Sequence, residues 1–185
     1  MSSMSDSSSQ AHYSAPGILA GVWGVAGMAL VLVDAATRLS NYMFEAFTYE
    51  WTVLHWALFI VNIGFMAYAE GYRGFQNSFV PRTVARAFYL AANPTWVNGL
   101  LAPLYCVGYF GAGKRTAKVM WIGTLLIVLA VVLIRQVPQP WRGIMDAGVV
   151  VGLSWGFAAT CIISLQALFS GRVPVLARVA SAELK

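Results

Sequence analysis

The stretch that decides the fold is 138-PQPWRGIMDAGVVVGLSWGFAATCIISLQALFSG-171, in which no charged residue follows Asp146. A small residue recurs at every fourth position after Asp146, at Gly148, Gly152, Gly156, Thr160 and Ser164. On a helix with about 3.6 residues per turn, this spacing makes one stripe that drifts by roughly 40° per step. Such GxxxG stripes let membrane helices approach closely. We therefore predict a membrane span whose packing surface is formed by Gly148, Gly152 and Gly156.

The composition of the whole chain agrees with a membrane protein. Of its 185 residues, 59% are hydrophobic and only 10% are charged, whereas soluble domains contain roughly 45–50% apolar and about 25% charged residues. The net charge of +5 comes from basic residues at the ends of apolar runs, a pattern that orients membrane proteins and does not indicate a nucleic-acid partner. Cys106 and Cys161 lie inside apolar segments, where they act as small apolar fillers.

The chain divides into three parts. Residues 1–16 are rich in serine and are predicted to form a disordered tail, residues 17–171 form the transmembrane helical domain, and residues 172–185 form a basic tail. No Lys or Arg precedes the first apolar run, so the pattern favours an uncleaved first span over a signal peptide.

The first span, residues 17–36, has its own small-residue face. Gly17, Gly21 and Gly24 follow one another at helical spacing. Since close backbone approach drives helix association in lipid, we expect this face to pack against the glycine stripe of the last helix.

A short helix beginning near Ser78 is predicted to lie at the membrane surface. Ser78 is a suitable N-cap and Pro81 suits the first turn. Arg82 and Arg86 lie four residues apart on one face, where guanidinium groups can contact lipid phosphates.

The segment 95–112 leaves two topologies open. It is long and apolar enough to cross, yet Asn98, Gly99, Pro103, Gly108 and Gly111 interrupt it. With five spans, seven basic residues lie inside and five outside. With four spans and a re-entrant or interfacial 95–112, nine lie inside and three, Arg38, Arg135 and Arg142, lie outside. The positive-inside bias favours the four-span arrangement.

We therefore predict an all-α fold, a bundle of four transmembrane helices plus one re-entrant or interfacial segment. In this arrangement a set of polar residues gathers near the outer face or on the adjoining helices, namely Asp34, His55, Asn62, Arg135, Arg142 and Asp146. Carboxylates and arginines inside a membrane pair with one another and mark transport pathways. The alternative interpretation of Asp34 with Arg38, and of Glu70 with Arg73, is an ion pair within one helix.

Standard catalytic and metal-binding signatures are missing from the sequence. A phosphate-binding glycine loop, HExxH, GxSxG and CxxC are all absent, so no catalytic residue and no metal site is predicted. His55 is the sharpest single candidate, since one intramembrane histidine can ligate a haem or chlorin or carry protons. The alternative for His55 is a structural hydrogen bond near the interface.

The sequence leaves three functions open and favours the first of them. The first is a non-catalytic subunit or assembly factor that binds lipid, another membrane protein or a second copy through its glycine-rich helix faces. The second is a small oligomeric transporter or channel that uses the polar cluster around Asp146, Arg142 and His55. The third is an enzyme acting on a lipid-soluble substrate. A bacterial inner membrane with a cytoplasmic C-terminus is the expected location.

Overall fold

The computed structural model describes residues 14–170, and every regular element within this range is helical. Four helices are long and apolar enough to cross a membrane: α1 (Ala15–Ala46), a continuous helix over residues 53–92, α6 (Lys114–Ile134) and α7 (Trp141–Ser170). The prediction of an all-α bundle with four spans is confirmed. The basic tail and all but the last three residues of the predicted Ser-rich tail lie outside the described residues.

The segment 95–112 does not form a fifth span. It folds into two short helices, α4 (Trp96–Leu100) and α5 (Ala102–Val107). Gly108 ends α5 with φ +107°, and Gly111 follows with φ +68°. Left-handed backbone of this kind stops a helix and favours glycine, because a side chain is strained there. Gly108 therefore terminates α5, both helices of the segment are too short to cross, and the alternative topology with five spans is wrong.

The helix over residues 53–92 is built from three parts: α2 (Val53–Met66), the π-helix η1 (Ala67–Phe79) and α3 (Val80–Ala92). We expected a separate surface helix beginning near Ser78. Instead the backbone remains helical throughout residues 53–92, with Pro81 inside the first turn of α3. Proline removes an N–H donor and its ring crowds the carbonyl of residue i−4, so a helix that continues through a proline bends there.

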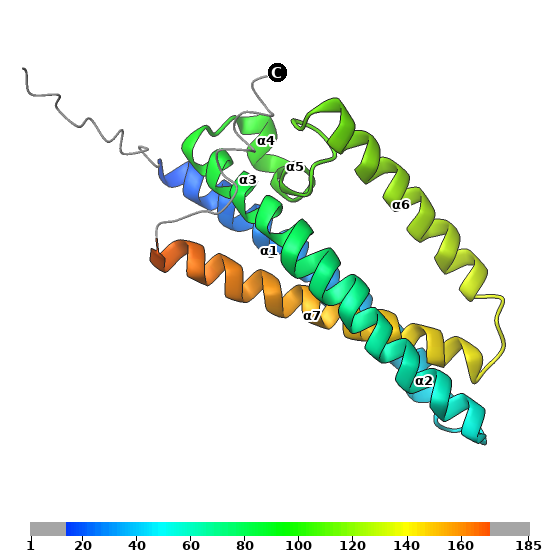
Figure 1. Cartoon of the computed structure of the whole chain (residues 1–185). Helices are drawn as coiled ribbons and strands as arrows, with labels where there is room; N and C mark the ends of the chain where they lie inside the picture. The colour runs from blue at the N-terminus through cyan, green and yellow to red at the C-terminus, as the bar shows by residue number, and fades with distance from the viewer. Residues whose placement is uncertain (1–13, 171–185) are drawn as a thin grey trace, which may run out of the picture.

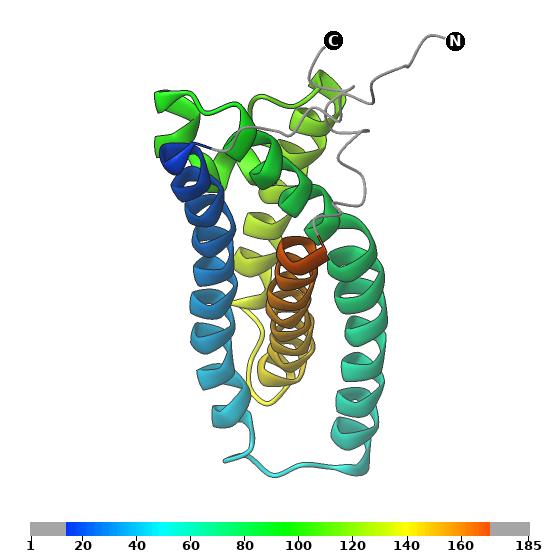
Figure 2. The same ribbon diagram turned by 90° about the vertical axis from the view of Figure 1, so that its left-hand side faces the viewer.

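The long helices lie side by side, with α7 packed between α1 and the helix 53–92 (Figures 1 and 2). The α3 part bends across one end of the bundle, where it contacts α1 and α5 (Figure 2). One apolar core joins α1, α3 and α5 there, and a second joins α3 to α7 around Val80, Val84 and Ala159. The sequence between Asn93 and Gly113 is thus anchored at the same end as the start of α1.

The two glycine faces do not meet each other, contrary to our prediction. A Cβ added at Gly21 would lie 2.9 Å from the carbonyl oxygen of Ala87, and one at Gly24 would lie 2.5 Å from Cys106 Sγ. The α1 face therefore packs against α3 and α5. The α7 face packs against side chains of α2 and η1 instead. Contact between α1 and α7 is nevertheless extensive, and Gly143 lies against Tyr42 and Ala46.

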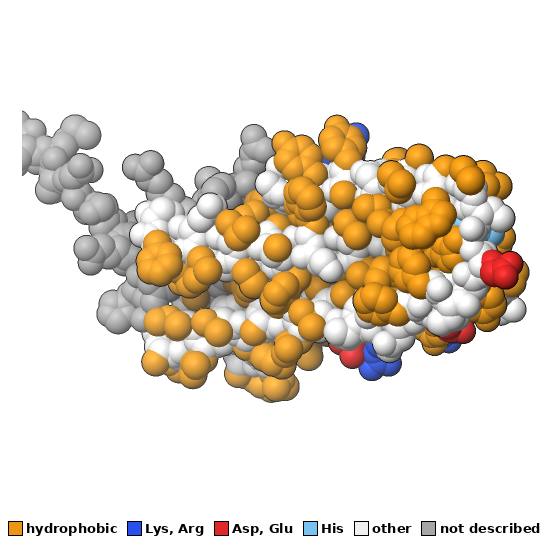
Figure 3. Space-filling view, turned by 90° about the horizontal axis from the view of Figure 1, so that it is seen from below, with side chains coloured by type: hydrophobic (Ala, Val, Ile, Leu, Met, Phe, Trp, Pro, Cys, Tyr) orange, Lys and Arg blue, Asp and Glu red, His pale blue; other side chains and the backbone are white. Residues whose placement is uncertain are grey.

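α6 stands apart from the other three long helices (Figure 1). It has no buried residue. The Tyr109 ring packs edge-on against Trp121 with 5.2 Å between centroids, and its hydroxyl bonds to Thr124. Apolar side chains also cover most of the face seen in Figure 3, as expected for a surface that lipid solvates.

Candidate functional site

Polar side chains line the surfaces of α7 that pack against α1 and against the helix 53–92, and we call these surfaces together the polar seam. Arg142 and Asp146 of α7 form an ion pair beside Tyr42 of α1. The surface toward the helix 53–92 carries Asn62, Glu70 and Gln76 of that helix and Trp155 of α7. The glycine stripe of α7 makes room for it: a Cβ at Gly152 would lie 2.6 Å from Glu70 Oε2, and one at Gly148 would overlap Asn62. The glycines predicted as a packing surface therefore accommodate polar groups.

Asn62 joins α2 to the first turns of α7. Its Nδ2 donates a hydrogen bond of 2.7 Å to the carbonyl oxygen of Ile144. Helical backbone carbonyls keep a second lone pair after their intrahelical bond, so the amide can donate without breaking the helix. The amide is thus a hydrogen-bonded contact between two spans, as membrane helices commonly use.

Asp146 is the most deeply buried charged group of the seam, with 3% of its surface exposed. Its Oδ2 lies 3.6 Å from Arg142 Nε, close enough for an ion pair and too far for a hydrogen bond. Neither of these two atoms has a hydrogen-bond partner among residues 14–170. The Arg142 guanidinium lies over the Tyr42 ring, 3.6 Å from its centroid, which adds a cation–π attraction. The pair is buried but loosely made.

His55 lies at the same end of the bundle and has a structural contact. Its Nδ1 accepts a hydrogen bond of 3.1 Å from the backbone N–H of Thr52, in the capping box that begins α2. Its ring packs edge-on against Trp141 with 4.4 Å between centroids. Nδ1 is therefore committed to the helix start, and only Nε2 remains for a ligand. No group of three metal-ligating side chains occurs in the described part of the chain.

The predicted polar cluster is only partly assembled. Arg142 and Asp146 pair with each other, Asn62 bonds to the backbone of the same turns of α7, and His55 lies against the first residue of α7. Asp34 instead pairs with Arg38 at 2.8 Å, with both side chains well exposed, as the alternative interpretation predicted. Arg135 is exposed at the end of α6. Asp34 and Arg135 are therefore outside the site, because α1 turns Asp34 outward and α6 stands apart.

Glu70 belongs to the seam, although the sequence interpretation paired it with Arg73. Within residues 14–170, no hydrogen bond or ion pair to the Glu70 carboxylate is found. The carboxylate lies against Gly152 in the middle part of α7, and Trp155 packs on the neighbouring Gly71. Trp155 Nε1 in turn donates a hydrogen bond of 2.8 Å to Gln76 Oε1. The signal that could have found Glu70 is its spacing, because it follows Asn62 and Met66 at intervals of four residues, as expected for one face of a helix.

The two arginines predicted to contact lipid phosphates differ. Arg82 is exposed, and its Nε donates to the carbonyl oxygen of Ser78 at 2.7 Å. Arg86 is only 6% exposed and donates from Nη1 to the carbonyl oxygen of Tyr105 at 3.1 Å. Arg86 therefore does not face the lipid as expected. Its hydrogen bond joins α3 to the end of α5.

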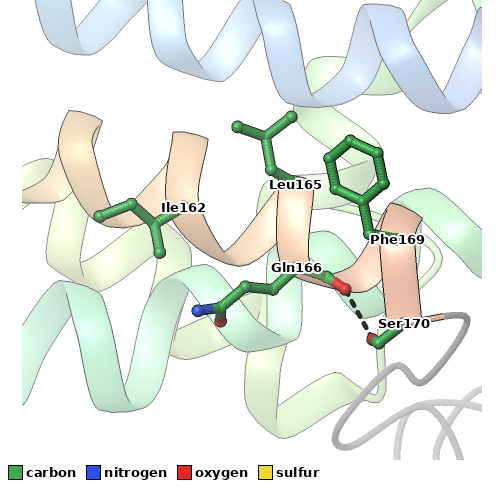
Figure 4. Close-up of a pocket in the computed structure, with 5 residues that line it drawn as sticks. All are labelled: Ile162, Leu165, Gln166, Phe169 and Ser170. Carbon is green, nitrogen blue, oxygen red and sulfur yellow. Dashed lines mark hydrogen bonds between the residues drawn. The ribbon is translucent and has the colours of Figure 1, made fainter.

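A shallow depression on the last two turns of α7 is lined by Ile162, Leu165, Gln166, Phe169 and Ser170 (Figure 4). Leu165 and Phe169 point to one side while the Gln166 amide points away from them (Figure 4). Apolar side chains of one helix form most of its lining, and within residues 14–170 no second element contributes a lining residue. The depression lacks the convergent polar groups of a ligand site.

The fold and the seam together define a polytopic helical membrane protein with four spans. No protein-family model matches this chain, and neither the search of curated proteins nor that of solved structures gives a match. The functional argument therefore depends on the geometry of the seam.

Proposed function

We propose that the protein is a small membrane transporter that moves an ion or a small polar solute along the polar seam. The buried, loosely made pair of Arg142 and Asp146 carries this proposal. Removing two charges from water is costly, and good hydrogen-bond geometry is needed to offset that cost. A pair 3.6 Å apart, with an unpartnered atom on each side chain, is a poor device for stability. It suits groups that exchange partners with a passing solute.

The position of the pair supports the same proposal. Arg142 and Asp146 lie in the first turns of α7, beside the junction of α7 with α1 and α2. Asn62 bonds to the carbonyl of Ile144, in the same turns of α7 as the pair, and Glu70 lies further along α7 at Gly152. In the proposal, a solute leaving the pair passes these polar groups as it moves along α7.

The glycine faces argue against the role that the sequence favoured, a subunit that binds a partner through them. Both stripes are occupied by other parts of the same chain. A different feature keeps a subunit role as the second candidate: α6 has no buried residue along its 21 positions. Native mass spectrometry of the protein extracted in its own lipids separates the two candidates. A second protein at fixed stoichiometry would support the subunit role.

We also propose that the end carrying α3, α4 and α5 faces the cytoplasm of a bacterial inner membrane. Six basic residues from Arg73 to Lys118 belong to this half of the molecule, and the positive-inside bias retains such residues. Single cysteines replacing Asn93 and Gln136, in a chain lacking Cys106 and Cys161, test the orientation. An impermeant maleimide should label Gln136→Cys in intact cells and Asn93→Cys only after lysis.

Flux through reconstituted protein tests the transport function. Full-length protein in phosphatidylethanolamine–phosphatidylglycerol vesicles is loaded with a pH-sensitive dye or with radioactive sodium, and efflux is followed. We expect Asp146→Asn to reduce flux at least tenfold with unchanged reconstituted amounts. Glu45→Gln, at an exposed position near the end of α1, is the matched control. Equal flux in wild type, Asp146→Asn and empty vesicles for both probes would count against the proposal.

A further inference from the structure

We infer that Glu70 is a proton-binding group inside the membrane, at the contact between η1 and α7. The inference deepens the proposed function, because it identifies the proton as the ion that the seam handles. It begins from the depth of the carboxylate. Gly152, against which Glu70 lies, is eleven residues after Trp141 and eighteen before Ser170. At 1.5 Å per residue these separations are about 16 Å and about 27 Å, so Glu70 lies well inside a hydrocarbon core about 30 Å thick.

The surroundings of Glu70 are apolar on the α7 side. Its carboxylate lies against Gly152, the Trp155 ring packs on the adjacent Gly71, and Gly156, one turn further along α7, meets the Phe75 ring. Between Ala147 and Ser170, α7 carries no charged side chain. An ionised carboxylate is far more costly than the neutral acid in such a medium. The proton is therefore the simplest counter-ion that this site can take.

The other elements packed against η1 bring no cation into contact with the Glu70 carboxylate in the described chain. The titratable and charged groups on the elements concerned are His55 on α2, Arg142, Asp146 and Cys161 on α7, Tyr68, Tyr72 and Arg73 on η1, and Arg82, Arg86 and Tyr89 on α3. Asp146 is six residues before Gly152, about 9 Å along α7. The other carboxylate of the seam is thus one and a half turns away.

The number of donors favours a proton over a metal cation. Calcium takes six to eight oxygen ligands and magnesium takes six. Glu70 supplies one carboxylate, and the α7 surface opposite it is glycine and aromatic carbon. A proton needs a single oxygen lone pair. Glycine at position 152 leaves the carboxylate free to change position as it gains or loses that proton.

The helix geometry at this point is a second, independent observation. η1 is a π-helix of 13 residues, in which hydrogen bonds run from i to i+5. Glu70 faces Gly152 and Phe75, five residues later, faces Gly156. The wider turn keeps both on the seam, whereas an α-helical turn would rotate Phe75 away. π-helical insertions are frequent at functional sites, and this one holds the only carboxylate of η1.

A hydrophobic carbodiimide tests the inference, because dicyclohexylcarbodiimide reacts with a protonated carboxyl group in the membrane. The acid O–H adds across one C=N bond: the carboxyl oxygen bonds to the central carbon and the proton goes to nitrogen. The acyl group then migrates to nitrogen, which leaves a stable acylurea with no leaving group. The protein mass therefore increases by one reagent molecule. Full-length protein in phosphatidylethanolamine–phosphatidylglycerol vesicles is treated at pH 6 and pH 9, and the modified peptide is sequenced by mass spectrometry.

We expect one adduct at Glu70, formed at least tenfold faster at pH 6 than at pH 9, and its loss in Glu70→Gln. Glu45→Gln should label like wild type, and Asp146→Asn should keep the Glu70 adduct. Labelling that is absent at both pH values, or confined to Asp146, would overturn the inference, as would protection by 100 mM sodium chloride but not choline chloride. Labelled Glu70 in a protein without flux would refute the proposed function alone. Flux without labelling would refute this inference alone.

Discussion

Substitution of Gly143 by alanine should separate α1 from α7. A Cβ at position 143 would lie 2.7 Å from the backbone oxygen of Tyr42 and would overlap the Cβ of Ala46. Both obstacles are on or next to the α1 backbone, so no side-chain rotation relieves them, and the helices must move apart. Overpacking of this kind costs about 1–3 kcal/mol, partly offset by the higher helix propensity of alanine, worth up to about 1 kcal/mol. The net loss should be about 1–2 kcal/mol.

The free energy of unfolding is measured by titrating SDS into bicelles and following tryptophan fluorescence. Gly123→Ala is the matched control, because a Cβ there meets nothing within 4 Å. It should leave stability unchanged or raise it by up to about 1 kcal/mol. A midpoint for Gly143→Ala equal to that of wild type, with Gly123→Ala also unchanged, would show that α1 and α7 are not in close backbone contact.

Three further substitutions test the seam and the end of α5. Asn62→Leu removes the donor to α7 and should cost about 0.6–1.7 kcal/mol in the same titration. Asn62→Gln keeps the amide but displaces it from the Ile144 carbonyl, so it should lose stability as well. Arg142→Leu leaves Asp146 buried without a cation and should cost about 3–5 kcal/mol. The double variant Arg142→Leu with Asp146→Leu should recover most of this stability. A double variant no more stable than Arg142→Leu would contradict an interaction between Arg142 and Asp146. Gly108→Ala strains a residue at φ +107° by about 1–3 kcal/mol and should speed proteolysis after α5, whereas Gly64→Ala, with open space around it, should not.

The number of spans followed from the sequence because its physical basis is local. Long charge-free runs predict helices that cross, and the count of basic residues distinguished four spans from five. Gly108 and Gly111 interrupt the apolar segment 95–112 in the sequence, and both have positive φ angles in the structure. The partner of each glycine face did not follow from the sequence. A small-residue stripe shows that something approaches closely, but the approaching helix depends on how α3 folds back onto α1.

The site was only partly predictable, and the reason is helical register. Asn62 and Glu70 are eight residues apart, and Gly148 and Gly152 opposite them are four apart. Met66, four residues after Asn62 and four before Glu70, also packs on Gly148. The residues that face the glycines of α7 therefore recur at every fourth position from Asn62 to Glu70. Beyond Glu70 the facing residue is Phe75, and the step becomes five because η1 is π-helical.

A regular wheel with a step of 100° places Glu70 and Phe75 about 140° apart, so sequence periodicity alone assigns them to different faces. On that wheel Glu70 and Arg73 lie on neighbouring positions, which explains the predicted ion pair between them. In the folded chain Glu70 keeps the regular spacing from Asn62 and Met66 and faces Gly152, the wider turn brings Phe75 to Gly156, and Arg73 is exposed. Glu70 is therefore the carboxylate of the seam that has no partner among the described residues, and it lies where the helical spacing changes from four residues to five. A sequence with the same apolar pattern and a regular α-helix over residues 67–79 would have the same four spans, but it would not align Glu70 and Phe75 with successive glycines of α7.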